Sequence, residues 1–225
     1  MKHILETKNL CYRYSDAPKD DYVFKNINMT FDEGKVYAIR GKSGSGKTTL
    51  LSLISGLETK YEGEILYLEK DMSKMDLDKY RNTDIGIVFQ SYNLLPTYTA
   101  LENIILSMDI SNIKDVDKKA KAIELMKQVG LKESQANRRV LKLSGGEQQR
   151  IAIARSLSYN PTIILADEPT GNLDKETEDE ILKIFKDLAH KENKCVIIVT
   201  HSKNVCDAVD EIYELGKKEE TKKKK

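Results

Sequence analysis

Four short apolar runs constrain the fold of this chain more than any other feature of its sequence. They occupy residues 36–39, 85–89, 163–166 and 196–200, they are rich in valine and isoleucine, and segments with helical character separate them. Runs of this kind are typical of buried parallel strands. Ligands of open α/β sheets bind beyond the carboxyl ends of the strands. The residues that follow the four runs should therefore meet at one site.

The first run leads into a glycine-rich segment from Gly41 to Thr48 that matches the pattern G-x-x-x-x-G-K-[ST] completely. Its glycines allow consecutive backbone N–H groups to surround phosphates, and the helix predicted from Thr48 to Ser55 points its positive end at them. Lys47 is expected to reach the β- and γ-phosphates, and the Thr48 hydroxyl is expected to bind Mg²⁺. The nucleotide-binding residues predicted in this loop are Gly41, Ser43, Gly44, Ser45, Gly46, Lys47, Thr48 and Thr49.

Two carboxylates, Asp167 and Glu168, follow the third run. Asp167 is placed to hold Mg²⁺ through a bound water. Pro169 disfavours helical geometry for Glu168, and an exposed Glu168 carboxylate can orient and polarise an attacking water as a general base. Together with the phosphate-binding loop, these residues predict a protein that binds ATP with Mg²⁺ and hydrolyses it.

A serine with two glycines lies between the second and third runs. The segment Ser144-Gly145-Gly146-Glu147 matches the S-x-x-E capping box that starts many helices. The glycines would leave backbone N–H groups open to an anion at the helix terminus. Taken alone, this segment indicates only the start of a helix.

In its wider context, Leu143 to Gln148 is similar to the signature of the ATP-binding cassette (ABC) family, and the chain resembles that family from roughly residue 4 to residue 215. The resemblance implies an α/β fold. It is the P-loop NTPase fold of an ABC nucleotide-binding domain, with a mainly parallel RecA-like core sheet, an antiparallel β subdomain and a helical insertion.

The resemblance also implies roles for residues outside these motifs. Gln90 matches the Q-loop, which senses Mg²⁺ and the attacking water, and His201 matches a switch that contacts the γ-phosphate. Tyr14 stands where the family has an aromatic residue that stacks on adenine, with Tyr12 as its rival by spacing. The implied catalytic residues are Lys47, Gln90, Glu168 and His201, the implied Mg²⁺ ligands are Thr48, Gln90 and Asp167, and the remaining ATP contacts are Ser144, Gly145, Gly146, Glu147 and Asp174 of the D-loop.

Domains of this family form head-to-tail homodimers that enclose two ATP molecules. The resemblance therefore implies that the catalytic face of one subunit meets Ser144 and Gly146 of the other. The charge of the γ-phosphate would then be shared between the P-loop and a foreign helix N-terminus. We expect ATP to favour the closed dimer and hydrolysis to permit its opening.

We expect a single ABC domain over residues 1–216, with a helical subdomain inserted at 91–141. Within the insertion, one apolar helix face is predicted by the spacing of Leu101, Ile104, Ile105 and Met108. Residues 217–225 are mostly lysine and glutamate, which predicts a disordered tail. Attraction of residues 222–225 to anionic lipid headgroups is a weaker alternative.

Composition limits the partners of the chain. Its 37 basic and 36 acidic residues give a net charge of +1, so no global field argues for nucleic acid. No apolar run approaches the roughly 20 residues that span a bilayer. We expect a chain that reaches the cytoplasmic face of the membrane through a separate permease. Cys11, Cys195 and Cys206 lack metal-ligand spacing and predict reduced, buried thiols.

The permease is expected to dock beside Gln90, in a groove within residues 90–98. The side chains predicted to line it are Tyr92, Leu94, Leu95 and Tyr98, although each of them could equally belong to the core.

Segments 89–96 and 166–174 resemble one branch of the ABC family, which contains macrolide exporters, lipoprotein-release transporters and peptide-antibiotic-resistance transporters. In that branch the membrane subunit transmits ATP-driven closure to an extracytoplasmic domain. A regulatory ATPase of the cell-division type shares segment 171–174 and is the alternative. A soluble ABC protein that acts on ribosomes or DNA is disfavoured, because the chain has one cassette and residues 91–141 show no sustained heptads.

Overall fold

The computed structural model describes residues 3–216 and 222–224, which form two β-sheets and the helices that cover them. The larger sheet has the strand order β10-β9-β3-β8-β7-β6. Its strands are β3 (Val36–Arg40), β6 (Ile85–Phe89), β7 (Ile163–Asp167), β8 (Cys195–Thr200), β9 (Glu211–Glu214) and β10 (Lys222–Lys224). All pairs in this sheet are parallel except β9 with β10.

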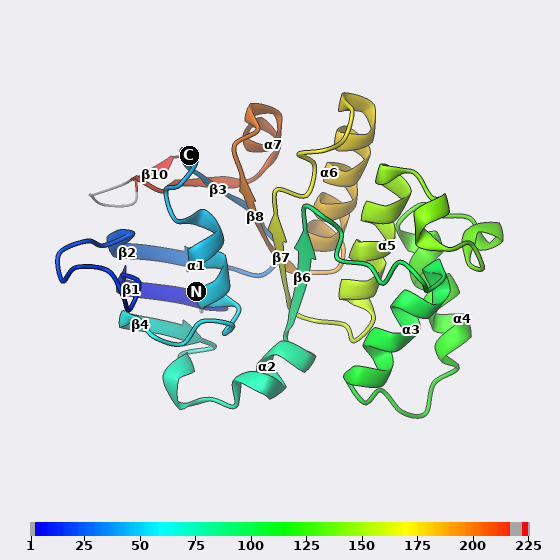
Figure 1. Cartoon of the computed structure of the whole chain (residues 1–225), viewed down its shortest axis with the longest axis horizontal. Coiled ribbons are helices and arrows are strands. Elements are labelled where there is room, and N and C mark those ends of the chain that lie inside the picture. The colour runs from blue at the N-terminus through cyan, green and yellow to red at the C-terminus, as the bar shows by residue number, and fades with distance from the viewer. Residues whose placement is uncertain (1–2, 217–221, 225) are drawn as a thin grey trace.

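The four apolar runs of the sequence are four adjacent strands of this sheet, β3, β8, β7 and β6 (Figure 1). Their carboxyl ends are in register, since Arg40 pairs with Thr200, and Asp167 pairs with both Val199 and Phe89. Every residue of β8 is buried, as expected for a strand covered on both faces. The ends of these four strands therefore lie side by side at one edge of the sheet.

The smaller sheet is antiparallel, with the strand order β2-β1-β4-β5. Its strands are β1 (Leu5–Tyr12), β2 (Phe24–Phe31), β4 (Glu62–Tyr67) and β5 (Lys70–Asp71). Figure 1 shows helix α1 (Lys47–Ile54) beside this sheet. Side chains from both sheets and from α1 form one hydrophobic core, to which the large sheet contributes Ile197 and Val199.

The opposite face of the large sheet is covered by helices, and Val196 and Ile198 point into this second core. Helices α5 (Gly145–Leu157) and α6 (Lys175–His190) lie against the sheet, and α3 (Ala100–Ile110) and α4 (Lys118–Gln128) pack on α5. Two shorter helices are α2 (Leu77–Thr83) and α7 (Lys203–Ala208), and single 3₁₀ turns span Met72–Lys74, Glu133–Gln135 and Val140–Lys142. The predicted fold class, including the antiparallel subdomain and the helical insertion, is confirmed.

Helix α3 begins at a reciprocal capping box between Thr99 and Glu102. Its predicted apolar face is buried at Leu101, Ile104 and Met108, while Ile105 is partly buried against the same core. No helix in the described part of the chain combines the length and apolarity that crossing a membrane requires.

Lys222–Lys224 form β10 and pair with β9, whose outer N–H and C=O groups would otherwise lie at the edge of the sheet. The disorder expected over residues 217–225 as a whole stays a prediction. Residues 217–221 and 225 lie outside the described residues, as do the side chains suggested to contact lipid. Among the cysteines, Cys195 and Cys206 are buried, whereas Cys11 is partly exposed where the β1–β4 register shifts.

Candidate nucleotide-hydrolysis site

The phosphate-binding loop joins the end of β3 to the start of α1. Gly46, the residue before the helix, has a φ of 90° and makes no side-chain cap. A Cβ at this position would lie 2.5 Å from Val23 Cγ1, so both the backbone conformation and the packing require glycine. The backbone N–H groups of the first helical turn are therefore left for an anionic ligand.

A cavity of about 710 Å³ lies over this loop. It is lined by the loop residues Ser43, Gly44, Gly46, Lys47, Thr48 and Thr49, by the carboxylates Asp167 and Glu168, and by Tyr14, Ala17, Asp21, Tyr22 and Val23 of the segment between β1 and β2. The last four residues escaped sequence analysis because they belong to a loop with no motif, and only the three-dimensional fold brings them here.

Lys47 Nζ donates hydrogen bonds to the backbone oxygens of Gly41, at 2.9 Å, and Lys42, at 3.2 Å. The loop thereby holds the ammonium group beside the cavity. Gly41 and Ser45 do not line this cavity. Gly41 is instead packed against Ser45, because a Cβ on Gly41 would lie 2.4 Å from the buried Ser45 Oγ. The structure therefore gives these two residues a role in the shape of the loop.

Asp167 ends β7 and faces α1. Burial raises the pKa of its carboxyl above the ordinary value, and the charge of Glu168 acts in the same direction. A hydrogen bond with the Thr48 side chain and the charge of Lys47 oppose this rise in the pKa. One carboxylate and one hydroxyl thus lie together at the foot of the cavity, a donor set that suits a hard cation that also binds phosphate oxygens.

Glu168 has a φ of 46°, outside the right-handed helical region that Pro169 was predicted to disfavour. Its Oε1 lies 2.7 Å from His201 Nδ1, and its Oε2 accepts from Thr200 Oγ1 at 3.3 Å and from the His201 N–H at 3.4 Å. These neighbours leave the side chain only 16 % exposed, so the expected exposed carboxylate is in fact largely covered. A positive φ at a non-glycine residue persists where surrounding contacts hold it.

Gln90 and His201 follow β6 and β8 and are both exposed. Gln90 Nε2 donates to Asn172 Oδ1 at 3.4 Å, and Gly171 leaves room for the same amide. Neither Gln90 nor His201 lines the cavity, although His201 reaches it through Glu168. The contact of Gln90 with Mg²⁺ stays a prediction.

The capping box that begins α5 is reciprocal. Ser144 Oγ accepts from the Glu147 N–H at 3.2 Å, and Glu147 Oε2 accepts from the Ser144 N–H at 2.7 Å. A Cβ on Gly146 would lie 2.5 Å from Thr177 Cγ2, and one on Gly145 would lie 2.9 Å from the Tyr92 hydroxyl. Close packing is thus a second reason for both glycines, and sequence analysis missed it because the contacting residues are distant in the chain.

The signature residues of α5 do not line the cavity over the loop of the same chain. The same holds for Asp174, whose carboxylate caps α6 by accepting from the Thr177 N–H at 3.0 Å and from Thr177 Oγ1 at 2.9 Å. Within a single chain, the signature residues of α5 and Asp174 therefore lie on a different surface from the phosphate-binding loop.

Tyr14 and Tyr12 differ sharply in exposure. Tyr14 is 51 % exposed and lines the cavity, with its hydroxyl 3.3 Å from Thr49 Oγ1. Tyr12 is only 6 % exposed, and its ring supports the edge of Tyr14 at a centroid distance of 5.3 Å. The structure favours Tyr14 as the residue that meets a base.

The fold and this site define a P-loop nucleoside triphosphatase of the α/β class. The sequence model of the family described as "ABC transporter" matches residues 24–171. Since this match covers most of the chain, the protein belongs to the ABC transporter family and is an ABC-type ATPase.

Known proteins are similar to this chain over nearly its whole length. The uncharacterized ABC transporter ATP-binding protein YclH of Bacillus subtilis (strain 168) is 47 % identical over 207 residues, which are 92 % of this chain and 91 % of that protein. The dimer of MJ0796, a bacterial ABC transporter cassette, is 38 % identical over 98 % of both chains, with a TM-score of 0.86. Its post-hydrolysis dimer bound to ADP and Pi has a TM-score of 0.88.

A further solved structure is cbiO1 of Clostridium perfringens, part of the ABC transporter complex cbiONQ. It is 28 % identical, with a TM-score of 0.87, over 99 % of this chain and 88 % of that one.

Proposed function

We propose that this chain is the ATP-hydrolysing subunit of an ABC transporter, that it dimerises around two ATP molecules, and that it drives a separate membrane subunit. The observation that carries the proposal is the position of Glu168. Its carboxylate is held by His201 and Thr200 at the rim of a cavity that also contains the phosphate-binding loop. A held carboxylate beside a phosphate site is the arrangement that positions an attacking water.

Each predicted site residue takes a distinct task in this proposal. Lys47 and the N–H groups of the loop bind the β- and γ-phosphates. Glu168 accepts the proton of the attacking water, while His201 holds that carboxylate and approaches the γ-phosphate. The hydrogen-bonded Thr48 hydroxyl and Asp167 carboxylate would hold Mg²⁺, and Gln90 would complete its surroundings. When bound, this ion supplies charge neutralisation to the phosphate oxygens.

Dimerisation is proposed because the α5 signature and the phosphate-binding loop lie on different surfaces of one chain. In a head-to-tail pair, Ser144 and Gly146 of one subunit would complete the site of the other. MJ0796 supports this arrangement, since it is dimeric both as a cassette and after hydrolysis.

Tyr14 is proposed to stack on adenine. Replacement of Tyr14 by alanine should raise the Kd for ATP about 5- to 150-fold, because stacking a base on an aromatic ring contributes about 1–3 kcal/mol. Tyr14→Phe keeps the ring and loses only the contact with Thr49, so its Kd should stay close to that of the wild type. Calorimetric titration with ATP measures both constants. An unchanged Kd for Tyr14→Ala would contradict the assignment.

The membrane subunit is proposed to dock on residues 95–98, next to Gln90. Of the four predicted lining residues, Leu95 and Tyr98 are 41 % and 39 % exposed, whereas Tyr92 and Leu94 pack against the helical core. The surface therefore offers two of the four expected side chains. Leu141, which is also exposed, lies nearby because the Val140 N–H donates to the Tyr98 carbonyl oxygen. We propose that these three exposed side chains receive a partner helix of the membrane subunit.

Leu95→Asp should weaken assembly with the membrane subunit and leave ATP binding intact, because a charge would have to be desolvated in the interface. Co-purification of tagged chain and membrane subunit measures assembly. Leu68→Asp is the matched control, since Leu68 is 50 % exposed but lies at the end of β4 in the antiparallel sheet. Equal recovery of the partner with Leu95→Asp and Leu68→Asp would rule out this docking surface.

We place the chain in the branch of macrolide exporters, lipoprotein-release transporters and peptide-antibiotic-resistance transporters, on the basis of segments 89–96 and 166–174. The test is to express tagged Glu168→Gln in the native host, add ATP, and identify the membrane proteins that co-purify in mild detergent. A partner with few helices and a large extracytoplasmic domain supports the proposal. A small partner bound to wall hydrolases would instead indicate the regulatory ATPase, and ribosomes would overturn the transporter assignment.

A further inference from the structure

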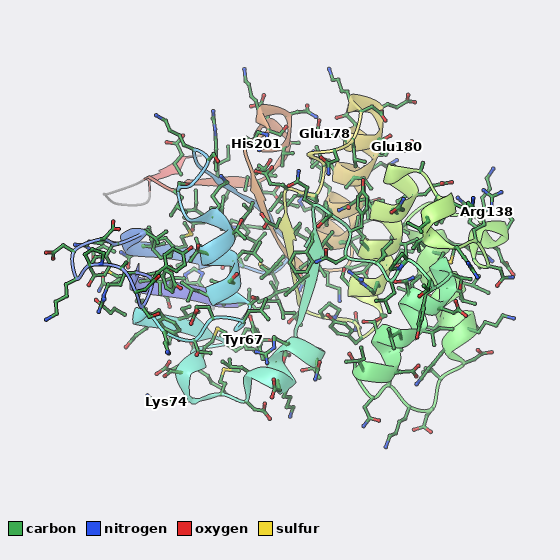
Figure 2. All side chains as sticks on the ribbon, in the orientation of Figure 1. Tyr67, Lys74, Arg138, Glu178, Glu180 and His201 are labelled. Carbon is green, nitrogen blue, oxygen red and sulfur yellow. The ribbon has the colours of Figure 1, made fainter. Side chains whose placement is uncertain are left out.

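Glu178, on the first turn of α6, joins two segments that follow different strands of the large sheet. Its Oε1 accepts a hydrogen bond from Thr170 Oγ1 at 3.1 Å and another from Ser202 Oγ at 3.0 Å. Thr170 is buried three residues after the end of β7, and Ser202 lies two residues after the end of β8. In Figure 2 Glu178 and His201 lie along the same edge of the molecule, where these strands end.

Both segments lead directly to Glu168. On the β8 side, the Ser202 N–H donates to Thr200 Oγ1 at 2.9 Å, and Thr200 Oγ1 donates to Glu168 Oε2. On the β7 side, the Gly171 N–H next to Thr170 donates to the Glu168 carbonyl oxygen at 3.1 Å. Glu178 is therefore connected to the side chain of Glu168 through one segment and to its backbone through the other.

The backbone of Glu168 needs such support. Its φ of 46° is unfavourable for a residue with a side chain and persists only where surrounding contacts determine it. The strands β7 and β8 stay paired up to the Glu168 N–H, which donates to the Val199 carbonyl oxygen at 2.9 Å. Beyond this point, the hydrogen bonds of Glu178 join the Thr170 and Ser202 segments and fix their spacing.

We propose that Glu178 is a positioning residue for ATP hydrolysis: by accepting from Thr170 and Ser202 it holds Glu168 and the His201 segment in the geometry that hydrolysis requires. This inference rests on the proposed role of Glu168 as general base. Glu178 is not among the residues that line the nucleotide cavity, so it acts on the rate of the chemical step and leaves the affinity for ATP unchanged.

A second hydrogen bond between α6 and α7 allows the positioning role of Glu178 to be tested without disturbing the packing of these helices. Asn204 Nδ2 donates to Asp179 Oδ1 at 2.9 Å, and this contact does not involve Glu178. The packing of α6 rests on Ile181, Phe185 and Leu188, which are buried in the helical core. Loss of the Glu178 carboxylate should therefore leave the two helices in place and release only the segments beside Glu168.

The experiment compares Glu178→Ala with Glu178→Gln in the full chain, by steady-state ATP hydrolysis. Alanine removes the shared acceptor, and kcat should fall about 10- to 100-fold with KM within about twofold of wild type, as expected for a misplaced catalytic group. Glutamine keeps an oxygen at the Oε1 position, so it should restore most of kcat. Glu180→Ala is the control on the same helix, since Glu180 pairs with Arg150 and does not line the nucleotide cavity.

Three results would overturn the inference: wild-type kcat in Glu178→Ala, equal losses in the alanine and glutamine variants, or a loss that appears in KM instead of kcat. The variant Thr170→Val removes one of the two donors to Glu178 and keeps the carboxylate, and its combination with Glu178→Ala should cost less than the sum of the single effects. Glu168→Gln in the same assay separates the two hypotheses. If that variant is inactive while Glu178→Ala is fully active, only the positioning role fails.

Discussion

Glu168→Gln should abolish ATP turnover and leave a chain that still binds ATP. Glutamine has the shape of glutamate, so its oxygen can still accept from His201 Nδ1, and Thr200 Oγ1, which has two acceptor sites, can accept from the new amide. What is lost is the ability to take a proton from water. General base catalysis contributes about 10²- to 10⁴-fold, so kcat should fall by at least this factor while the Kd for ATP stays close to that of the wild type.

Phosphate release measures the rate, and light scattering of the purified chain with ATP measures its association state. Because the bound nucleotide is no longer cleaved, the variant should accumulate as an ATP-bound dimer, whereas the wild type returns to its starting state as ATP is consumed. Glu176→Gln is the matched control. Glu176 is exposed in the first turn of α6, and its replacement by glutamine removes the same negative charge. Hydrolysis by Glu168→Gln at the wild-type rate would remove Glu168 from the mechanism.

The strands and the phosphate-binding loop could be predicted from sequence because their signals are local. A buried parallel strand must be apolar on both faces, as β8 is, and the loop pattern specifies its own backbone conformation, as Gly46 does at a φ of 90°. The meeting of β3, β6, β7 and β8 at one edge follows from the rule that parallel strands share a direction.

The contacts that complete the site could not be predicted because they join distant segments. Nothing in the Ser144 to Glu147 motif shows that Gly146 packs against Thr177. The capping of α6 by Asp174 does fit the general N-cap rule, a local signal that sequence analysis did not use. Glu178 lacks even that signal, since its partners precede it at Thr170 and follow it at Ser202.

The two lysines of the loop provide the second large test. Lys47 Nζ is held by the backbone oxygens of Gly41 and Lys42 at the edge of the cavity, where phosphate oxygens would replace or join these acceptors. Lys42 contributes its carbonyl oxygen, and its own side chain is exposed and does not line that cavity. The two lysine side chains therefore carry the same charge, but only that of Lys47 lines the cavity.

Lys47→Ala should raise the Kd for ATP, because a hydrogen bond to a charged group contributes about 1.5–3 kcal/mol, which corresponds to roughly 10- to 150-fold in affinity. Lys42→Ala should bind ATP nearly as the wild type does, since it removes the same charge but no ammonium group beside the cavity. Calorimetric titration of both variants with ATP shows whether the Lys47 ammonium group contacts the phosphates or whether the positive charge of the loop as a whole attracts ATP. Equal losses in the two would mean that the loop attracts ATP by its net charge alone, whereas a loss confined to Lys47→Ala assigns the phosphate contact to the ammonium group that Gly41 and Lys42 hold in place.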